Sequence, residues 1–151
     1  MVARPDTHDD RLSMALNLEL SRGRHGASAR IELHERLDGR LALVALQGWL
    51  DRPAVLCLDR SLDDLAARGV DQLLLDCSRL CHIHYRLVPL LVSSLARFES
   101  RAGGFVVCGL SRYLRDLFRL AGCESRLRCW PSAAELLGPA DALEPSRASA
   151  S

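Results

Sequence analysis

The chemically most varied stretch of the sequence runs from residue 76 to residue 87. Its cysteines and histidines, Cys77, Cys81, His82 and His84, are residue types that bind zinc. A structural zinc site usually draws two short pairs of ligands from separate elements, and no second pair is visible here. Cys81, His82 and His84 are therefore noted as metal candidates, while the expectation for the chain is no bound metal and no other cofactor.

The same stretch could also hold a nucleophile or bind an anion. A thiol beside a histidine near a helix start can have a lowered pKa, which would activate Cys81. Adjacent residues of a strand face opposite ways, however, so Cys81 and His82 are poorly placed to work as a pair. An imidazole and a guanidinium at His84 and Arg86 would instead donate hydrogen bonds to an anion. We therefore expect a binding surface and no enzyme activity.

The flanking patterns place this stretch between a strand and a helix. An apolar run over residues 70–75 predicts a buried strand before it. After it, apolar residues at helical spacing predict an amphipathic helix: Leu87, Leu90, Leu91, Leu95 and Phe98. The varied residues should thus lie on the loop that enters this helix.

The rest of the chain repeats the alternation of strand and helix. Residues 31–33 alternate like a half-buried strand, Asp38-Gly39 is a strong hairpin signal, and residues 41–46 and 105–108 are apolar runs. Asp51 and Ser111 are suited to begin helices that end before Gly69 and Gly122. Residues 125–130 predict an edge strand, followed by a short helix from residue 132. The order predicts an α/β sandwich with a mostly parallel five-stranded sheet, an N-terminal β-hairpin and about four helices.

The length of 151 residues suits one domain with two terminal extensions. Residues 1–28 are mostly polar and predict a flexible N-terminal extension, in which residues 12–20 could form a short helix or a partner-binding segment. Residues 29–137 should form the folded domain. Residues 138–151 are rich in proline, alanine and serine and predict a disordered tail.

The composition narrows the classes of partner. The formal net charge is only +1, so no bulk attraction draws the chain to nucleic acid or to an anionic membrane. All basic residues are arginine, which excludes Schiff-base or P-loop lysine chemistry. No apolar run approaches the roughly 20 residues of a membrane span, and the polar start shows no signal-peptide pattern. We expect a cytoplasmic protein, not embedded in a membrane, with reduced thiols.

The order of elements, together with five short motifs, resembles the STAS domain of anti-sigma-factor antagonists over roughly residues 30–137. The motifs are Gly48-Trp49-Leu50-Asp51, Asp76-Cys77-Ser78, Gly104, Gly109-Leu110-Ser111 and Leu120-Ala121-Gly122. The resemblance implies a bacterial protein-interaction module in signal transduction and transcription regulation. Its partner would be an anti-sigma factor, a kinase-like ATPase or another STAS protein.

One motif of the family is changed. Members that act as phospho-switches carry Asp-Ser-Ser-Gly at the start of the second helix, and the matching residues here are His84, Tyr85, Arg86 and Leu87. Tyr85 stands where the phosphorylated serine would be. The resemblance therefore implies partner binding at this surface without the usual serine phosphorylation switch.

The expected partner-binding residues are His84, Tyr85, Arg86 and Leu87, joined by Arg112 and Arg115 from a basic stripe on the following helix. Two alternatives remain open. The domain could be a STAS subunit that docks on an ABC-transporter ATPase with the same helix face. It could also be a metal- or anion-responsive sensor that uses the Cys77–His84 loop.

Overall fold

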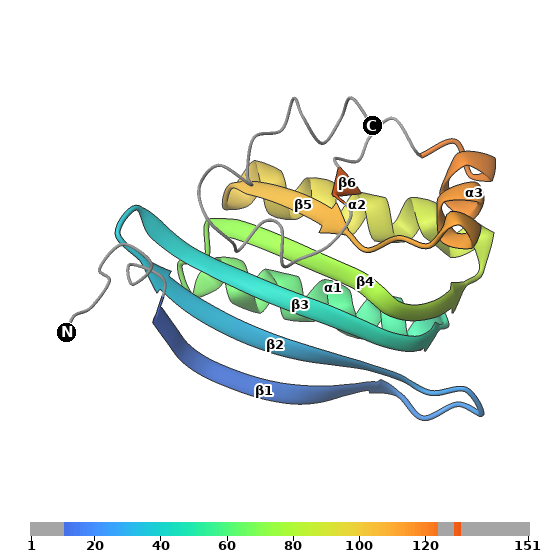
Figure 1. The fold of residues 1–151 in the computed structure, drawn as a ribbon, viewed down its shortest axis with the longest axis horizontal. Coiled ribbons are helices and arrows are strands. Elements are labelled where there is room, and N and C mark those ends of the chain that lie inside the picture. Colours follow the sequence, from blue (N-terminus) through green and yellow to red (C-terminus); the bar gives the residue numbers. More distant parts are fainter. Residues whose placement is uncertain (1–10, 124–128, 131–151) are drawn as a thin grey trace.

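The computed structural model describes residues 11–123 and 129–130 and contains one six-stranded sheet (Figure 1). Each strand lies beside its neighbour in sequence, in the order β1-β2-β3-β4-β5-β6. The strands are β1 (Arg11–Ser21), β2 (Ala27–Arg36), β3 (Gly39–Leu50), β4 (Gln72–Ile83), β5 (Gly104–Cys108) and β6 (Cys129–Trp130).

The sheet is mixed, which corrects the expected mostly parallel five-stranded sheet. Strands β1, β2 and β3 pair antiparallel, because short turns join them and reverse the chain direction. Strands β3, β4, β5 and β6 pair in parallel, because a helix returns the chain between each of them. Of the predicted edge strand over 125–130, only β6 belongs to the described residues.

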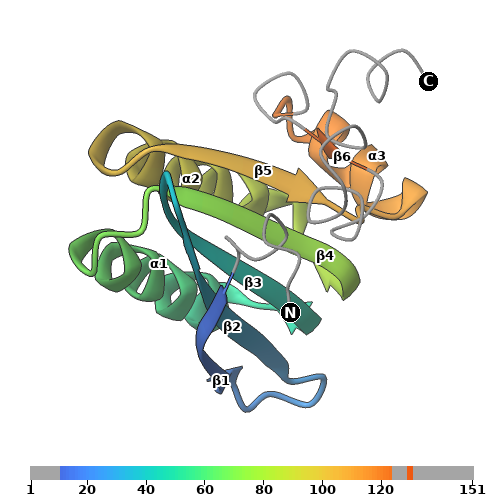
Figure 2. The ribbon, with the colours of Figure 1, turned by 60° about the vertical axis from the view of Figure 1, so that its left-hand side comes forward.

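Three α-helices occur in the described part of the chain: α1 (Arg52–Ala67), α2 (Val88–Arg101) and α3 (Arg112–Leu120). A short 3₁₀ turn, η2 (Tyr85–Leu87), precedes α2. Helices α1 and α2 contact each other on one face of the sheet (Figure 2), while α3 contacts η2 and β4. The further helix expected from residue 132 lies outside the described residues. None of the described helices has the length and apolar character needed to cross a bilayer.

The main core fills the space between the sheet and helices α1 and α2. Its largest fully buried side chains include Leu46, Leu58, Leu75, Leu91 and Leu95. A smaller cluster of Leu41, Leu74 and Cys108 is buried apart from it. Strands β3 and β4 thus bury residues in two clusters, as their unbroken apolar runs predicted.

The predicted flexible extension over residues 1–28 is wrong from Arg11 onward, because residues 11–21 form the strand β1. Met14, Leu16 and Leu18 pair with Leu33, Ile31 and Ala29 of β2, with polar or small residues between them. That alternation has a period of two, the period of a strand, and a turn at residues 22–26 closes the hairpin. The folded domain therefore begins well before residue 29.

Candidate interaction site

The loop between β4 and α2 is held by local hydrogen bonds. His84 precedes η2, and its Nδ1 atom accepts a hydrogen bond from the backbone N–H of Arg86 at 3.1 Å. The backbone N–H of Leu87 donates to the carbonyl of His84 at 2.8 Å. Ile83 and Val88 on either side are fully buried, so both ends of the loop are fixed to the core.

The side chains on this loop form one exposed cluster. The rings of His84 and Tyr85 stack with their centroids 5.3 Å apart, and the Arg86 guanidinium lies 5.9 Å from the Tyr85 ring centroid. Tyr85 is 40% exposed, His84 and Arg86 are exposed, and Leu87 is half-buried. The structure thus brings together the four loop residues that the sequence indicated.

The two arginines expected at the interface lie on α3, next to this loop. Ser111 caps the helix, with its Oγ atom accepting a hydrogen bond from the Leu114 N–H at 3.1 Å. Leu114 and Phe118 are buried against the fold, which leaves Arg112 and Arg115 exposed. Because α3 contacts η2, the arginine-bearing helix and the loop cluster belong to neighbouring parts of the surface.

A row of four aromatic rings connects this region with the β1–β2 hairpin. His25 stacks on Trp49 with 4.0 Å between centroids, Trp49 lies 4.7 Å from His82, and His82 lies 5.7 Å from Tyr113. The Tyr113 hydroxyl is 2.5 Å from His82 Nδ1. Burial, with a smaller contribution from the charge of His84, lowers the pKa of His82, which favours its neutral imidazole. We call these four residues the ring row.

His25 and Tyr113 are site residues that the sequence patterns do not reveal. His25 lies in a turn that had been assigned to the flexible extension, and Tyr113 belongs to a helix whose position relative to β4 no sequence spacing reveals. A strand signal over residues 11–21 would have placed His25 at the end of a hairpin, close to the end of β3.

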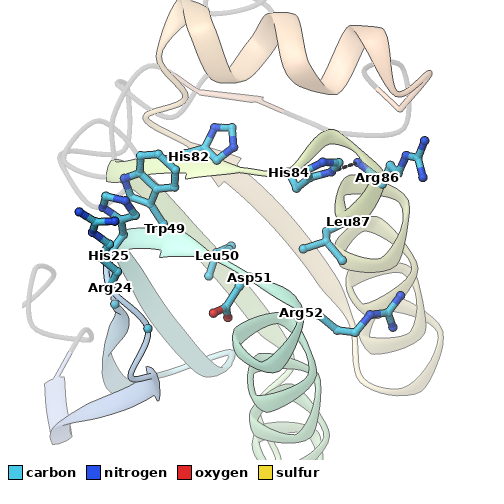
Figure 3. A pocket seen from close by; sticks show the side chains of 12 residues that line it. Arg24, His25, Trp49, Leu50, Asp51, Arg52, His82, His84, Arg86 and Leu87 are labelled. Carbon is cyan, nitrogen blue, oxygen red and sulfur yellow. Dashed lines mark hydrogen bonds between the residues drawn. The ribbon is translucent and has the colours of Figure 1, made fainter.

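A hollow of about 480 Å³ lies between the ring row and the loop cluster (Figure 3). We call it the basic hollow. Half of its twelve described lining residues are arginine or histidine: Arg24, His25, Arg52, His82, His84 and Arg86. Asp51, the one acidic residue among the described residues of the lining, accepts a hydrogen bond from the Ala54 N–H at 3.0 Å and caps α1. The three arginines outnumber the single carboxylate of the described lining and therefore give the hollow a net positive charge.

The metal candidates are not gathered into a site. Cys77 is buried and Cys81 is exposed, while His82 faces Tyr113 and His84 caps η2. Within residues 11–123 and 129–130, no three histidine, cysteine or acidic side chains lie close enough to hold a metal ion together.

Comparison with known proteins identifies the family. A family model described as "Mlab, STAS domain" matches residues 33–129, well over half of the chain. This chain therefore belongs to the STAS domain family, as the sequence motifs predicted. A search of the curated proteins found no match.

Solved structures with the same fold include two anti-sigma factor antagonists. The unphosphorylated form of SpoIIAA matches with a TM-score of 0.52 and 21% identity, covering 66% of this chain and 86% of that one. An anti-sigma factor antagonist from Mycobacterium paratuberculosis matches with a TM-score of 0.58 and 18% identity, covering 85% of this chain and 99% of that one. At these identities the likeness establishes the fold.

Proposed function

We propose that this STAS domain is a non-enzymatic regulatory module, resembling an anti-sigma-factor antagonist, that binds a protein partner. Its docking surface would consist of His84, Tyr85, Arg86, Leu87, Arg112 and Arg115. The observation that carries the proposal is the exposed cluster of ring and guanidinium groups on the rigid loop before α2. Tyrosine and arginine are enriched among the residues that dominate binding energy at protein interfaces.

The charge of the docking surface indicates an acidic partner. Arg86, Arg112 and Arg115 all contribute positive charge, while Asp116 on the same helix is paired with Arg119 at 2.9 Å. Complementary charge speeds association and selects against wrong partners. An anti-sigma factor or kinase-like ATPase with an acidic patch is the partner that this surface fits best.

The proposed module works without the serine switch. A phosphate on the family serine would add roughly −1.5 to −2 charges at the docking surface. Here Tyr85 occupies that position and extends its hydroxyl along Arg86, with the Arg86 Nε atom 3.5 Å away. A kinase specific for serine would find no substrate at this position, so partner binding would be controlled in another way.

Affinity capture with the full chain tests this proposal. Tyr85→Ala and Arg86→Ala should each weaken partner binding by about tenfold or more, as expected for interface residues of this type. Leu37→Ala is the matched control, because Leu37 is 85% exposed in the β2–β3 turn, away from the docking surface. Unchanged affinity in both docking-surface variants would refute the assignment of this surface.

The same capture distinguishes the second candidate function. Recovery of an ABC-transporter ATPase, with binding still lost in the docking-surface variants, would assign the same face to a STAS subunit of a transporter. Recovery of an anti-sigma factor or kinase-like ATPase would support the antagonist role. Purified components and isothermal titration calorimetry should then give the affinity of each pair.

A further inference from the structure

The basic hollow has features of a ligand site that protein docking does not require. We propose that it binds a small organic anion that carries an apolar body. Its volume of about 480 Å³ falls within the range typical of small-molecule sites, roughly 300–1,000 Å³. It lies beyond the carboxyl ends of the parallel strands β3 and β4.

The apolar part of the ligand would contact the inner wall of the hollow. Trp49, Leu50 and Leu87 contribute this wall, and Trp49 is 42% exposed even though His25 stacks on it. An exposed tryptophan beside two aliphatic side chains favours a ligand with a flat or aliphatic body over inorganic phosphate. Burial of that body would supply binding energy that charge alone does not give at a solvated surface.

The acidic part of the ligand would be met by arginines from separate elements. Arg24 comes from the β1–β2 turn, whereas Arg52 comes from the start of α1 and Arg86 from η2, on the other side of the hollow (Figure 3). The Arg86 guanidinium is turned toward Tyr85, so Arg24 and Arg52 are the arginines more available to the ligand. His84 adds a donor, because its Nδ1 atom accepts the Arg86 N–H and leaves Nε2–H in the neutral ring. Asp51 is already engaged as the cap of α1.

This ligand site goes beyond the proposed function, although His84, Arg86 and Leu87 also belong to the docking surface. A bound anion would neutralise positive charge beside the loop cluster. It would therefore lower the affinity of the docking surface for an acidic partner. The ligand test needs no partner, so its failure leaves the docking proposal standing, and failure of partner capture leaves the ligand site standing.

Two fluorescent dyes separate charge from apolar contact. The anionic dye 8-anilinonaphthalene-1-sulfonate and the neutral dye N-phenyl-1-naphthylamine share the same ring body and differ by the sulfonate. Fluorescence titration of the full chain should show saturable binding of the anionic dye, about tenfold tighter than that of the neutral dye. Equal affinity for the two dyes, or no saturable binding of the anionic dye, would overturn the proposal.

Substitutions around the hollow then show where on the protein the anionic dye binds. Arg24→Gln and Arg52→Gln, both at exposed side chains, should each weaken the anionic dye by about threefold or more and leave the neutral dye unchanged. Trp49→Ala should weaken both dyes. The control is Arg60→Gln, because Arg60 lines a separate groove between β1 and α1. If Arg60→Gln weakens binding of the anionic dye while Arg24→Gln and Arg52→Gln do not, the dye binds in that groove, and the proposal for the basic hollow is rejected.

Discussion

The two ends of the parallel strands β3 and β4 differ in the side chains that they expose. At the amino end, Gly39 and Gly103 pack directly against Asp71, and a Cβ atom on Gly103 would lie 2.0 Å from the Asp71 carbonyl oxygen. Asp71 also exchanges hydrogen bonds with Arg40, whose backbone N–H it accepts at 3.1 Å through Oδ1. This end is closed by backbone groups in close contact.

The carboxyl end instead leaves large side chains open to a ligand or partner. Trp49 is 42% exposed and Tyr85 is 40% exposed, and the basic hollow lies between their elements. The backbone is closely packed at this end too, since a Cβ atom on Gly48 would lie 2.1 Å from the Gly26 carbonyl oxygen. The exposed aromatic and basic side chains of the proposed docking surface and of the basic hollow are therefore gathered at the carboxyl end.

Among the variants at these two strand ends, the largest effect is expected for Gly103 at the closed end. Gly103→Ala should lower the free energy of unfolding by about 2–3 kcal/mol, because the new methyl group must push the Asp71 backbone away. Gly104→Ala is the matched control, since its Cβ would meet only the Gln72 side chain at 3.7 Å. Urea denaturation measures both, and equal losses would mean that the amino end is not closely packed.

At the open end, Asp51 stabilises the start of α1 as its cap. Asp51→Ala should lower the free energy of unfolding by about 1 kcal/mol, because the Ala54 N–H loses its acceptor. Asp51→Asn keeps a capping oxygen and should retain most of that stability, while it makes the basic hollow more positive. If both variants lose the same stability in urea denaturation, the carboxylate acts through charge and not through capping.

The confirmed predictions of strands, turns and helix caps depended on residues that are close together in the sequence. An unbroken apolar run is enough to predict the buried strands β3, β4 and β5. The Asp38-Gly39 turn and the helix caps Asp51 and Ser111 depend only on residues next to them in the sequence. The closed end shows the limit of such signals. Gly103 and Asp71 are far apart in sequence, and nothing in their spacing shows that their backbones meet.

The site divides in the same way. The loop cluster was predicted from the changed family motif at residues 84–87. The predicted loop over 76–87 began too early, because β4 continues through Cys77, Cys81 and His82 to Ile83. The ring row was not found, because it depends on the hairpin turn, two strand ends and α3 meeting in space. The strand β1 was not predicted, because its leucines and its methionine alternate with polar or small residues inside a segment that is polar overall.

Removing the Tyr85 side chain from the proposed docking surface should cost much less stability than disturbing the closed end. Tyr85→Ala should change the free energy of unfolding by less than about 1 kcal/mol, because the ring is exposed and its contacts are with other exposed side chains. Leu91→Ala, in the buried face of α2, should cost about 2–5 kcal/mol and serves as the comparison. A similar loss in both variants would mean that Tyr85 supports the core.

The smallest effect concerns the pH dependence of the open end. Burial lowers the pKa of His82 below its ordinary value of 6.5, so between the two values the unfolded chain binds more protons than the folded one. The stabilising contribution of neutral His82 is therefore complete above pH 6.5 and decreases as the pH falls toward the folded pKa. His82→Phe keeps a ring beside Trp49 but cannot titrate, and we expect it to flatten this part of the curve of unfolding free energy against pH.

Glu32 provides an internal reference for that measurement. Its pKa lies below 4.5, chiefly because it forms a hydrogen bond with His34, so its contribution is present above pH 4.5 and is lost as the pH falls through the lowered value. The acid part of the curve should be the same in the wild type and in His82→Phe. An unchanged slope just below pH 6.5 in His82→Phe would mean that His82 has the same pKa in the folded and the unfolded chain, which would contradict its partial burial in the ring row.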